Sequence, residues 1–254
     1  MNPFNKNNQL SIFITAGYPN LSALPDQIDF LEANGIVFIE VGIPFSDPMA
    51  DGPTIQESSD VALKNGMTVS LLFDQLAEVK SSIPLVIMSY FNPILHFGLE
   101  RFLEQCNRVN ISHVIIPDIS LEVYEKLYQS KFEKFGVTLC FLVTPRTTSE
   151  RISQMSQHSS NGFIYLVASA MTTGGGTDET PSKSLSKEEV IRIRSAVGET
   201  PLMIGFGIKT QKDIAAVHEI ANGAIIGSAY IKALSEGKEK SFISNVLAIE
   251  PQNP

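Results

Sequence analysis

The sequence predicts a (β/α)8 barrel, also called a TIM barrel, from three observations. Short apolar segments rich in β-branched residues recur about every 25 to 35 residues, and amphipathic segments with helical periodicity separate them. The short segments are almost continuously apolar, which is typical of parallel strands covered on both faces. No break in composition divides the 254 residues, so we expect a single domain over residues 1–254.

The apolar segments predict eight strands. They are expected at residues 10–15, 38–41, 85–89, 113–117, 138–143, 163–167, 202–205 and 224–226. Eight strand–helix alternations of this kind close into a barrel. A doubly wound open sheet is the alternative, but no Gly-x-Gly-x-x-Gly motif follows the first strand, and a dinucleotide-binding fold therefore has little support.

Eight helices are predicted from the amphipathic segments. They are expected at residues 24–34, 68–79, 99–109, 121–135, 149–157, 187–197, 211–219 and 229–236. Two of them have recognisable starts, since Ser186 and Glu189 have the spacing of a capping box and Thr210 lies just before another helix. In a barrel the loops after the strands surround one mouth, and we expect Asp118 and the residues discussed below to lie there.

Composition excludes several classes of function. The net charge of −8 argues against nucleic acid or an anionic membrane as the main partner, and no segment has the length and apolarity of a membrane span. Cys106 and Cys140 lie in apolar segments without metal-ligand spacing, so we expect buried free thiols and a cytoplasmic location. The four histidines are scattered, no metal site is expected, and His113 is expected in the core at the start of a strand.

Residues 38–56 carry the acidic groups of greatest interest. Glu40 interrupts an apolar strand, where an ionised side chain costs several kcal/mol, and Asp47 and Asp51 follow on the next loop. A carboxylate near the carboxyl end of a strand, followed by acids on the adjoining loop, suits acid–base chemistry on an enclosed substrate. The alternative makes Glu40 a salt-bridge partner at the strand tip and the loop acids turn formers.

The late loops predict an anion site. Residues 205–208 and 227–229 each contain glycine, follow a predicted strand and lead into a helix, and a third glycine-rich segment covers residues 173–176. Glycine lets the backbone approach a ligand, and the first N–H groups of a helix have no internal partner. Barrels often bind phosphate at the loops after strands seven and eight. The alternative is that these glycines only form tight turns.

Residues 40–56 closely resemble the signature of tryptophan synthase α subunits. The resemblance continues in the same order through residues 13–19, 89–93, 117–118, 205–208 and 227–229. It implies a lyase of tryptophan biosynthesis on a (β/α)8 barrel, which cleaves indole-3-glycerol phosphate to indole and glyceraldehyde 3-phosphate. It also implies an α2β2 assembly in which indole passes to a β subunit. The cofactor pyridoxal phosphate (PLP) is expected in that β subunit and none in this chain.

The resemblance implies roles for individual residues by motif position. Glu40 matches the principal acid–base carboxylate, and Asp51 matches the second acid. The positions implied to bind substrate are Phe13, Tyr90 and Thr173, and those implied to bind phosphate are Gly174, Gly207, Gly227 and Ser228. The apolar neighbours of Glu40 favour a raised pKa, whereas Asp51 on its polar loop is expected to stay ionised.

The loop after the sixth strand departs from the family pattern. Ala168 and Ser169 replace a Ser-Arg pair, and Met171 replaces a glycine, within a segment that resembles the family's closing lid over residues 168–176. Two hypotheses follow. The chain is an aldolase with an altered lid, or it has weak or lost cleavage and acts mainly as an allosteric activator of the β subunit. A related phosphate-binding barrel enzyme of histidine or tryptophan synthesis is the remaining alternative, and such an enzyme is expected to lack residues 47–53.

Overall fold

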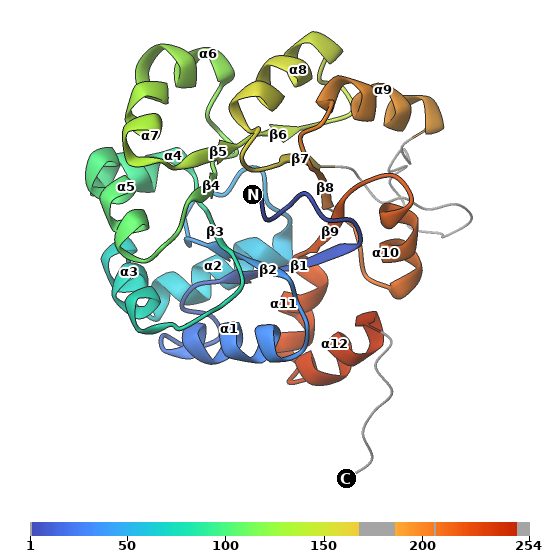
Figure 1. Cartoon of the computed structure of the whole chain (residues 1–254). Coiled ribbons are helices and arrows are strands. Elements are labelled where there is room, and N and C mark those ends of the chain that lie inside the picture. Colours follow the sequence, from blue (N-terminus) through green and yellow to red (C-terminus); the bar gives the residue numbers. More distant parts are fainter. Residues whose placement is uncertain (1, 168–185, 206, 248–254) are drawn as a thin grey trace.

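The strands form one parallel barrel in the computed structural model, which describes residues 2–167, 186–205 and 207–247 (Figure 1). The strands are β1 Gln9–Thr15, β2 Phe38–Gly42, β3 Leu85–Met88, β4 His113–Ile115, β5 Thr138–Cys140, β6 Leu142–Val143, β7 Ile164–Val167, β8 Leu202–Gly205 and β9 Gly223–Ile226. Their order is β5-β4-β3-β2-β1-β9-β8-β7-β6. The first and last strands of this order, β5 and β6, are two halves of one predicted strand that is interrupted at Phe141. The chain therefore connects them directly and closes the barrel. The predicted eight-strand barrel is confirmed.

Helices surround the barrel on its outer side (Figure 1). They are α1 Ala23–Ala33, α2 Pro53–Lys64, α3 Val69–Glu78, α4 Phe91–Phe97, α5 Leu99–Arg108, α6 Leu121–Val123, α7 Gln129–Phe135, α8 Ser149–His158, α9 Lys187–Val197, α10 Gln211–His218, α11 Ser228–Ser235 and α12 Glu239–Leu247. All eight predicted helices are present, although the one expected at 121–135 contains a π-helix, η1, over Tyr124–Tyr128. The sequence analysis missed α2, α4 and α12.

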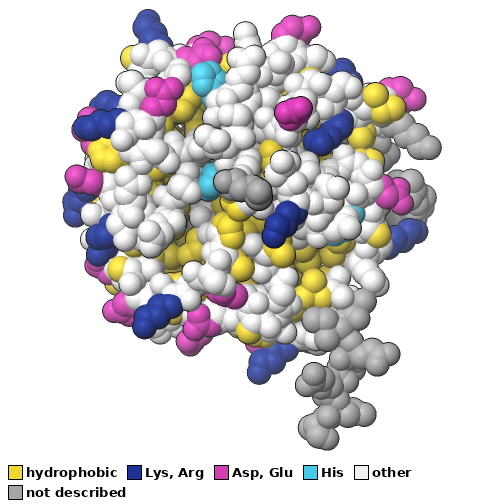
Figure 2. Space-filling model, viewed as in Figure 1, with side chains coloured by type: hydrophobic (Ala, Val, Ile, Leu, Met, Phe, Trp, Pro, Cys, Tyr) yellow, Lys and Arg dark blue, Asp and Glu magenta, His cyan; other side chains and the backbone are white. Residues whose placement is uncertain are grey.

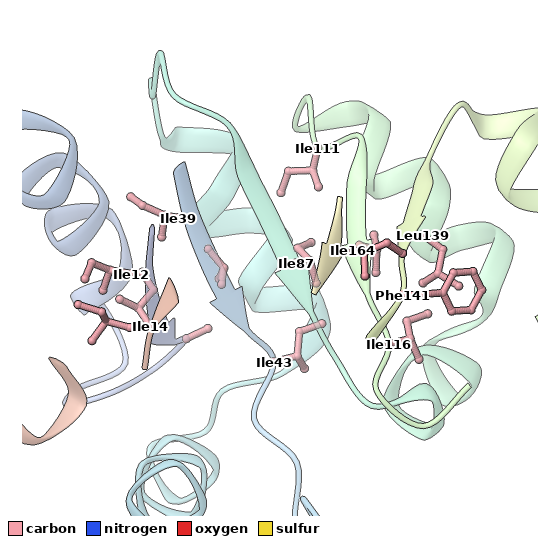
Figure 3. Packing of buried hydrophobic residues seen from close by; sticks show 14 of the residues in the cluster. Ile12, Ile14, Ile39, Ile43, Ile87, Ile111, Ile116, Leu139, Phe141 and Ile164 are labelled. Atoms are coloured by element: carbon pink, nitrogen blue, oxygen red, sulfur yellow. The ribbon is translucent and has the colours of Figure 1, made fainter. Parts of the chain in front are cut away.

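Successive residues of each strand point to opposite sides of the barrel wall, so the strands contribute to two separate buried cores. Ile12, Ile39, Ile87 and Ile164 point away from the barrel axis and pack under the surrounding helices (Figure 3). The inward-facing residues form a second buried cluster with members in or beside most of the strands, although none of them comes from β1. Its fully or almost fully buried members are Phe4, Phe38, Val86, Ile115, Cys140, Phe163, Met203 and Ile225. The barrel is therefore a packed core with no open channel along its axis.

The N-terminal segment closes the amino end of the barrel. The Phe4 ring lies 5.1 Å from the ring of Phe38 and 4.8 Å from that of Phe163, centroid to centroid. Phe38 begins β2, so Phe4 covers the end of the barrel at which the strands start. Space for a ligand inside the barrel is therefore confined to the opposite end, where the strands finish.

Other expectations about the core are confirmed. Cys106 and Cys140 are free and buried, and burial raises the pKa of the Cys140 thiol to about 12. His113 begins β4, is buried, and its Nε2 lies 2.9 Å from the carbonyl oxygen of Asn161.

On the face shown in Figure 2, charged side chains lie mainly around the periphery. No helix of the described residues is long and apolar enough to cross a membrane.

Candidate active site

Glu40 is a buried carboxyl group at the inner wall of the barrel. It lies in β2 between Phe13 of β1 and Val86 of β3, the residues paired with it in the strand register. Its exposed fraction is 0%, and neither carboxyl oxygen has a hydrogen-bond partner among the described residues. Burial raises the pKa of Glu40 to about 8, so the group holds its proton at neutral pH. No cationic group among the described residues forms an ion pair with Glu40, so the salt-bridge role considered for it has no support from them.

Asp51 is held at the end of the loop between β2 and α2. The Tyr90 hydroxyl accepts the N–H of Ala50 at 2.8 Å and donates to Oδ2 of Asp51 at 3.2 Å. Burial raises the pKa of Asp51, and the hydrogen bond from Tyr90 opposes that shift. The two acids therefore differ in surroundings, since Asp51 has a donor for its carboxylate and Glu40 has none.

The two acids face one cavity at the carboxyl ends of the strands. The cavity has a volume of about 110 Å³. Of the predicted site residues, it brings together Phe13, Glu40, Asp51, Gly207, Gly227 and Ser228. Tyr90 lines a small adjoining cavity that shares Phe13 and Asp51 with the first. Thr173 and Gly174 lie outside the described residues, as does the altered loop over 168–176.

The far side of this cavity has the features of an anion site. Gly227 caps α11, and its carbonyl accepts the N–H groups of Tyr230 and Ile231. The N–H groups of Ser228 and Ala229 belong to the first turn, which has no partner within the helix, and both residues line the cavity. Gly207 has φ +73°, a conformation that favours glycine, in the loop after β8.

Five residues of the cavity wall were not predicted as site residues from the sequence. They are Ile55, Met88, Tyr165, Lys209 and Ile225. Burial, together with the charges of Glu40 and Asp51, raises the pKa of the Tyr165 hydroxyl, so it remains protonated. A Cβ on Gly205 would lie 2.2 Å from this hydroxyl oxygen, which explains why β8 ends in glycine. Two signals in the sequence could have identified members of this group. Tyr165 occupies an inward-facing position of β7, and Lys209 directly follows the predicted 205–208 loop.

Two further acids have structural partners. Oδ1 of Asp118 accepts the N–H of Phe91 at 2.8 Å and so caps the first turn of α4. Oδ2 of Asp47 accepts the hydroxyl of Ser46 at 2.6 Å. Neither residue lines the cavity that contains Glu40. Among the described residues, no group of three or more histidine, cysteine or acidic side chains is placed to hold a metal ion.

A parallel barrel whose two acids and helix N-terminus face one cavity at the carboxyl ends of its strands has the arrangement of a (β/α)8-barrel enzyme. Residues 3–251 match the family model described as "Tryptophan synthase alpha chain". The tryptophan synthase alpha chain of Flavobacterium johnsoniae is 46% identical over 247 residues, which cover 93% of this chain and 94% of the relative. That of Bacteroides thetaiotaomicron is 44% identical over 92% of this chain and 91% of the relative. The chain belongs to the tryptophan synthase alpha chain family.

Solved structures agree with this assignment. Tryptophan synthase from M. tuberculosis, in an open form with BRD0059 bound, superposes with a TM-score of 0.82 at 28% identity, covering 96% of this chain and 93% of the other. The tryptophan synthase A-subunit from Pyrococcus furiosus superposes with a TM-score of 0.83 at 28% identity, covering 96% and 99% of the two chains. The similarity therefore extends over nearly the whole barrel.

Proposed function

We propose that this chain is the α subunit of a tryptophan synthase and cleaves indole-3-glycerol phosphate to indole and glyceraldehyde 3-phosphate. The observation that carries the proposal is the shared cavity, in which Glu40 and Asp51 face the glycine turns at Gly207 and Gly227. A substrate with an indole ring at one end and a phosphate at the other needs an acid–base group near its centre and an anion site at one end. The cavity offers both.

Glu40 is proposed as the group that moves the proton. In the first step its carboxylic acid donates a proton to C3 of the indole ring, and the ring nitrogen becomes positively charged. In the second step the bond from C3 to the glycerol carbon breaks, and its electron pair returns to the ring. The hydroxyl on that carbon loses its proton to the Glu40 carboxylate and becomes the aldehyde. The raised pKa supports this role, because the side chain starts protonated and ends protonated.

Asp51 is proposed as the partner of the indole N–H. A carboxylate beside that nitrogen stabilises the positive charge that protonation at C3 creates. The hydrogen bond from Tyr90 favours the ionised form of Asp51 and also fixes the loop that carries it. Tyr90 is therefore proposed as a positioning residue for Asp51, a role additional to the substrate-binding role that the family resemblance implies.

The phosphate is proposed to bind at the N-terminus of α11. The N–H groups of Ser228 and Ala229, the loop at Gly207 and the partial positive charge of the helix end all favour an anion. Lys209 lines the same end of the cavity and adds a full positive charge. Thr173 and Gly174 remain predictions from the family resemblance. We expect no cofactor in this chain and PLP in the β subunit with which it assembles.

Release of glyceraldehyde 3-phosphate from indole-3-glycerol phosphate tests the proposal, measured by coupled oxidation with and without a β subunit. We expect release by the chain alone and faster release in the assembly. Asp51→Asn should slow release substantially, and Glu40→Gln should slow it further. No release under either condition, combined with normal stimulation of β-subunit turnover, would favour the alternative in which the chain acts only as an activator.

A further inference from the structure

A second and larger pocket lies outside the barrel wall, away from Glu40. It has a volume of about 450 Å³ and is bounded by the loop after β2, the α2–α3 connection and helices α4 and α5. Its walls are mostly apolar side chains, namely Ile43, Pro44, Phe45, Leu63, Met67, Val69, Pro93 and Phe97. The volume and the apolar lining are typical of small-molecule sites.

The polar groups of this pocket favour an anion. Although the chain carries a net charge of −8, no aspartate or glutamate lines the pocket. Its basic side chains are Arg101, which carries a permanent positive charge, and His96. The Arg101 guanidinium carbon lies 4.2 Å from the centre of the Phe97 ring. Arg101 forms no ion pair with the described residues. Arg108, about two turns further along α5, differs in this respect, because its Nη2 lies 3.5 Å from Oδ1 of Asp74.

The arrangement of Arg101 prepares it to bind a carboxylate. Stacking on Phe97 holds the planar guanidinium in place, and its N–H groups can then bind both oxygens of a carboxylate in parallel. The start of α3, at Thr68, Val69 and Ser70, opens on the same pocket and adds a partial positive charge. A single guanidinium beside extensive apolar walls suits a small anionic head on an apolar body better than a phosphate or a polyanion.

We propose that this pocket binds a small aromatic carboxylate, with its ring against Phe45 and Phe97 and its carboxylate on Arg101. The site is separate from the catalytic cavity, and neither Arg101 nor Phe97 lines that cavity. Phe45 connects the two regions, because its ring lies 5.3 Å from that of Tyr90, whose hydroxyl holds Asp51. An occupant of the pocket therefore contacts the loop that carries the second acid.

Calorimetric titration of the full chain with 3-phenylpropionate tests the proposal, and the neutral 3-phenylpropionamide serves as the matched ligand. We expect saturable binding of the acid and about tenfold weaker binding of the amide, since a charged hydrogen-bonded pair is lost. Arg101→Gln should weaken binding of the acid about tenfold to the level of the amide. Arg108→Gln is the control, and it should leave the affinity within twofold because Arg108 does not line this pocket.

A substitution at the rim of the pocket tests the effect of charge on binding without disturbing the fold. Leu63 is 37% exposed at the edge of the pocket, so Leu63→Glu should fold normally and weaken binding of the acid by charge repulsion, whereas Leu63→Gln should not. If neither Arg101→Gln nor Leu63→Glu changes the affinity for the acid, the probe binds in the catalytic cavity and the proposal is overturned. Absence of saturable binding, or an affinity that falls as protein concentration rises, would also overturn it and assign the groove to a macromolecular partner or a second copy.

Discussion

Replacing Glu40 by glutamine tests the catalytic cavity through both activity and stability. The amide has nearly the shape of the carboxylic acid, but it neither donates a proton to the indole ring nor accepts one from the hydroxyl. We expect turnover to fall by about 10²- to 10⁴-fold, which is the range for loss of a general acid–base group. The same change should alter how stability depends on pH, because Glu40 is fully buried and its oxygens have no partner among the described residues.

The magnitude follows from the two pKa values of Glu40. Burial raises the pKa in the folded chain to about 8, against 4.5 for the ordinary side chain. Between these values the unfolded chain has lost a proton that the folded chain keeps. This acid therefore favours folding most below pH 4.5, and its contribution is lost as pH rises towards 8. The free energy of unfolding falls by at most about 1.4 kcal/mol per pH unit, or about 3 kcal/mol by pH 7.

Urea unfolding at pH 5, 6, 7 and 8, followed by far-UV circular dichroism, measures this effect. The stability difference between Glu40→Gln and the unaltered chain should grow in favour of the variant as pH rises, whatever constant offset the buried amide adds. Glu32→Gln is the control. Hydrogen bonds led by that of the Ser82 side chain lower the pKa of Glu32, so its contribution is lost as pH falls below about 4.5. A difference for Glu40→Gln that stays flat from pH 5 to 8 would show that burial does not raise the pKa of Glu40.

Three other substitutions test the remaining parts of the site. Tyr90→Phe removes the hydroxyl that fixes Asp51, and in steady-state assays kcat should fall about tenfold or more while KM changes little. Gly205→Ala would place a methyl group 2.2 Å from the Tyr165 hydroxyl oxygen, so turnover should be lost while the far-UV spectrum of the barrel remains. Lys209→Gln should raise KM for the phosphorylated substrate several-fold with kcat nearly unchanged, and added salt should reduce that difference.

Matched variants control two of these tests. Tyr128→Phe removes a hydroxyl from a ring that packs against Phe91 rather than from the Asp51 loop, and it should leave kcat unchanged. Lys212→Gln removes an exposed charge from the first turn of α10 and should leave KM unchanged. If Tyr90→Phe behaves like Tyr128→Phe, Tyr90 does not position Asp51. If the Gly205→Ala variant turns over its substrate at the normal rate, the Tyr165 side chain moves aside without loss of activity.

The barrel is predictable from the sequence because its strands are defined locally. The segment expected at residues 38–41 is β2 Phe38–Gly42, and the helix expected at 187–197 is α9 with the same bounds. The capping box between Ser186 and Glu189 is present, and Thr210 caps α10 in the same way with Asp213. A continuous apolar run or an N-cap residue determines the structure of only the few residues beside it. Strands and helix starts of this kind can therefore be located without knowledge of the tertiary structure.

Helix α2, one of the three helices that were not predicted, lacks this local signal. The buried face of α2 includes Ser58 and Ser59 beside Ile55 and Ala62, which interrupts the apolar stripe by which a helix is recognised. The Ser58 hydroxyl is instead satisfied in the fold, since it lies 2.7 Å from the Thr15 hydroxyl of β1. A partner 43 residues away cannot be inferred from helical periodicity. The start of α2, and hence the position of Asp51 before it, therefore depended on tertiary structure.

The two acids share one cavity but differ in their surroundings, and this difference bears on the roles proposed for Glu40 as proton donor and for Asp51 as anion. The carboxyl oxygens of Glu40 have no hydrogen-bond partner among the described residues, so burial acts without opposition and the pKa of Glu40 rises to about 8. Asp51 is also pushed upward by burial, but the Tyr90 hydroxyl opposes the shift by donating to its carboxylate. The sequence supplies two similar carboxyl groups. They differ in the fold because Glu40 is fully buried, whereas Asp51 is partly exposed and accepts a hydrogen bond from a hydroxyl 39 residues away along the chain.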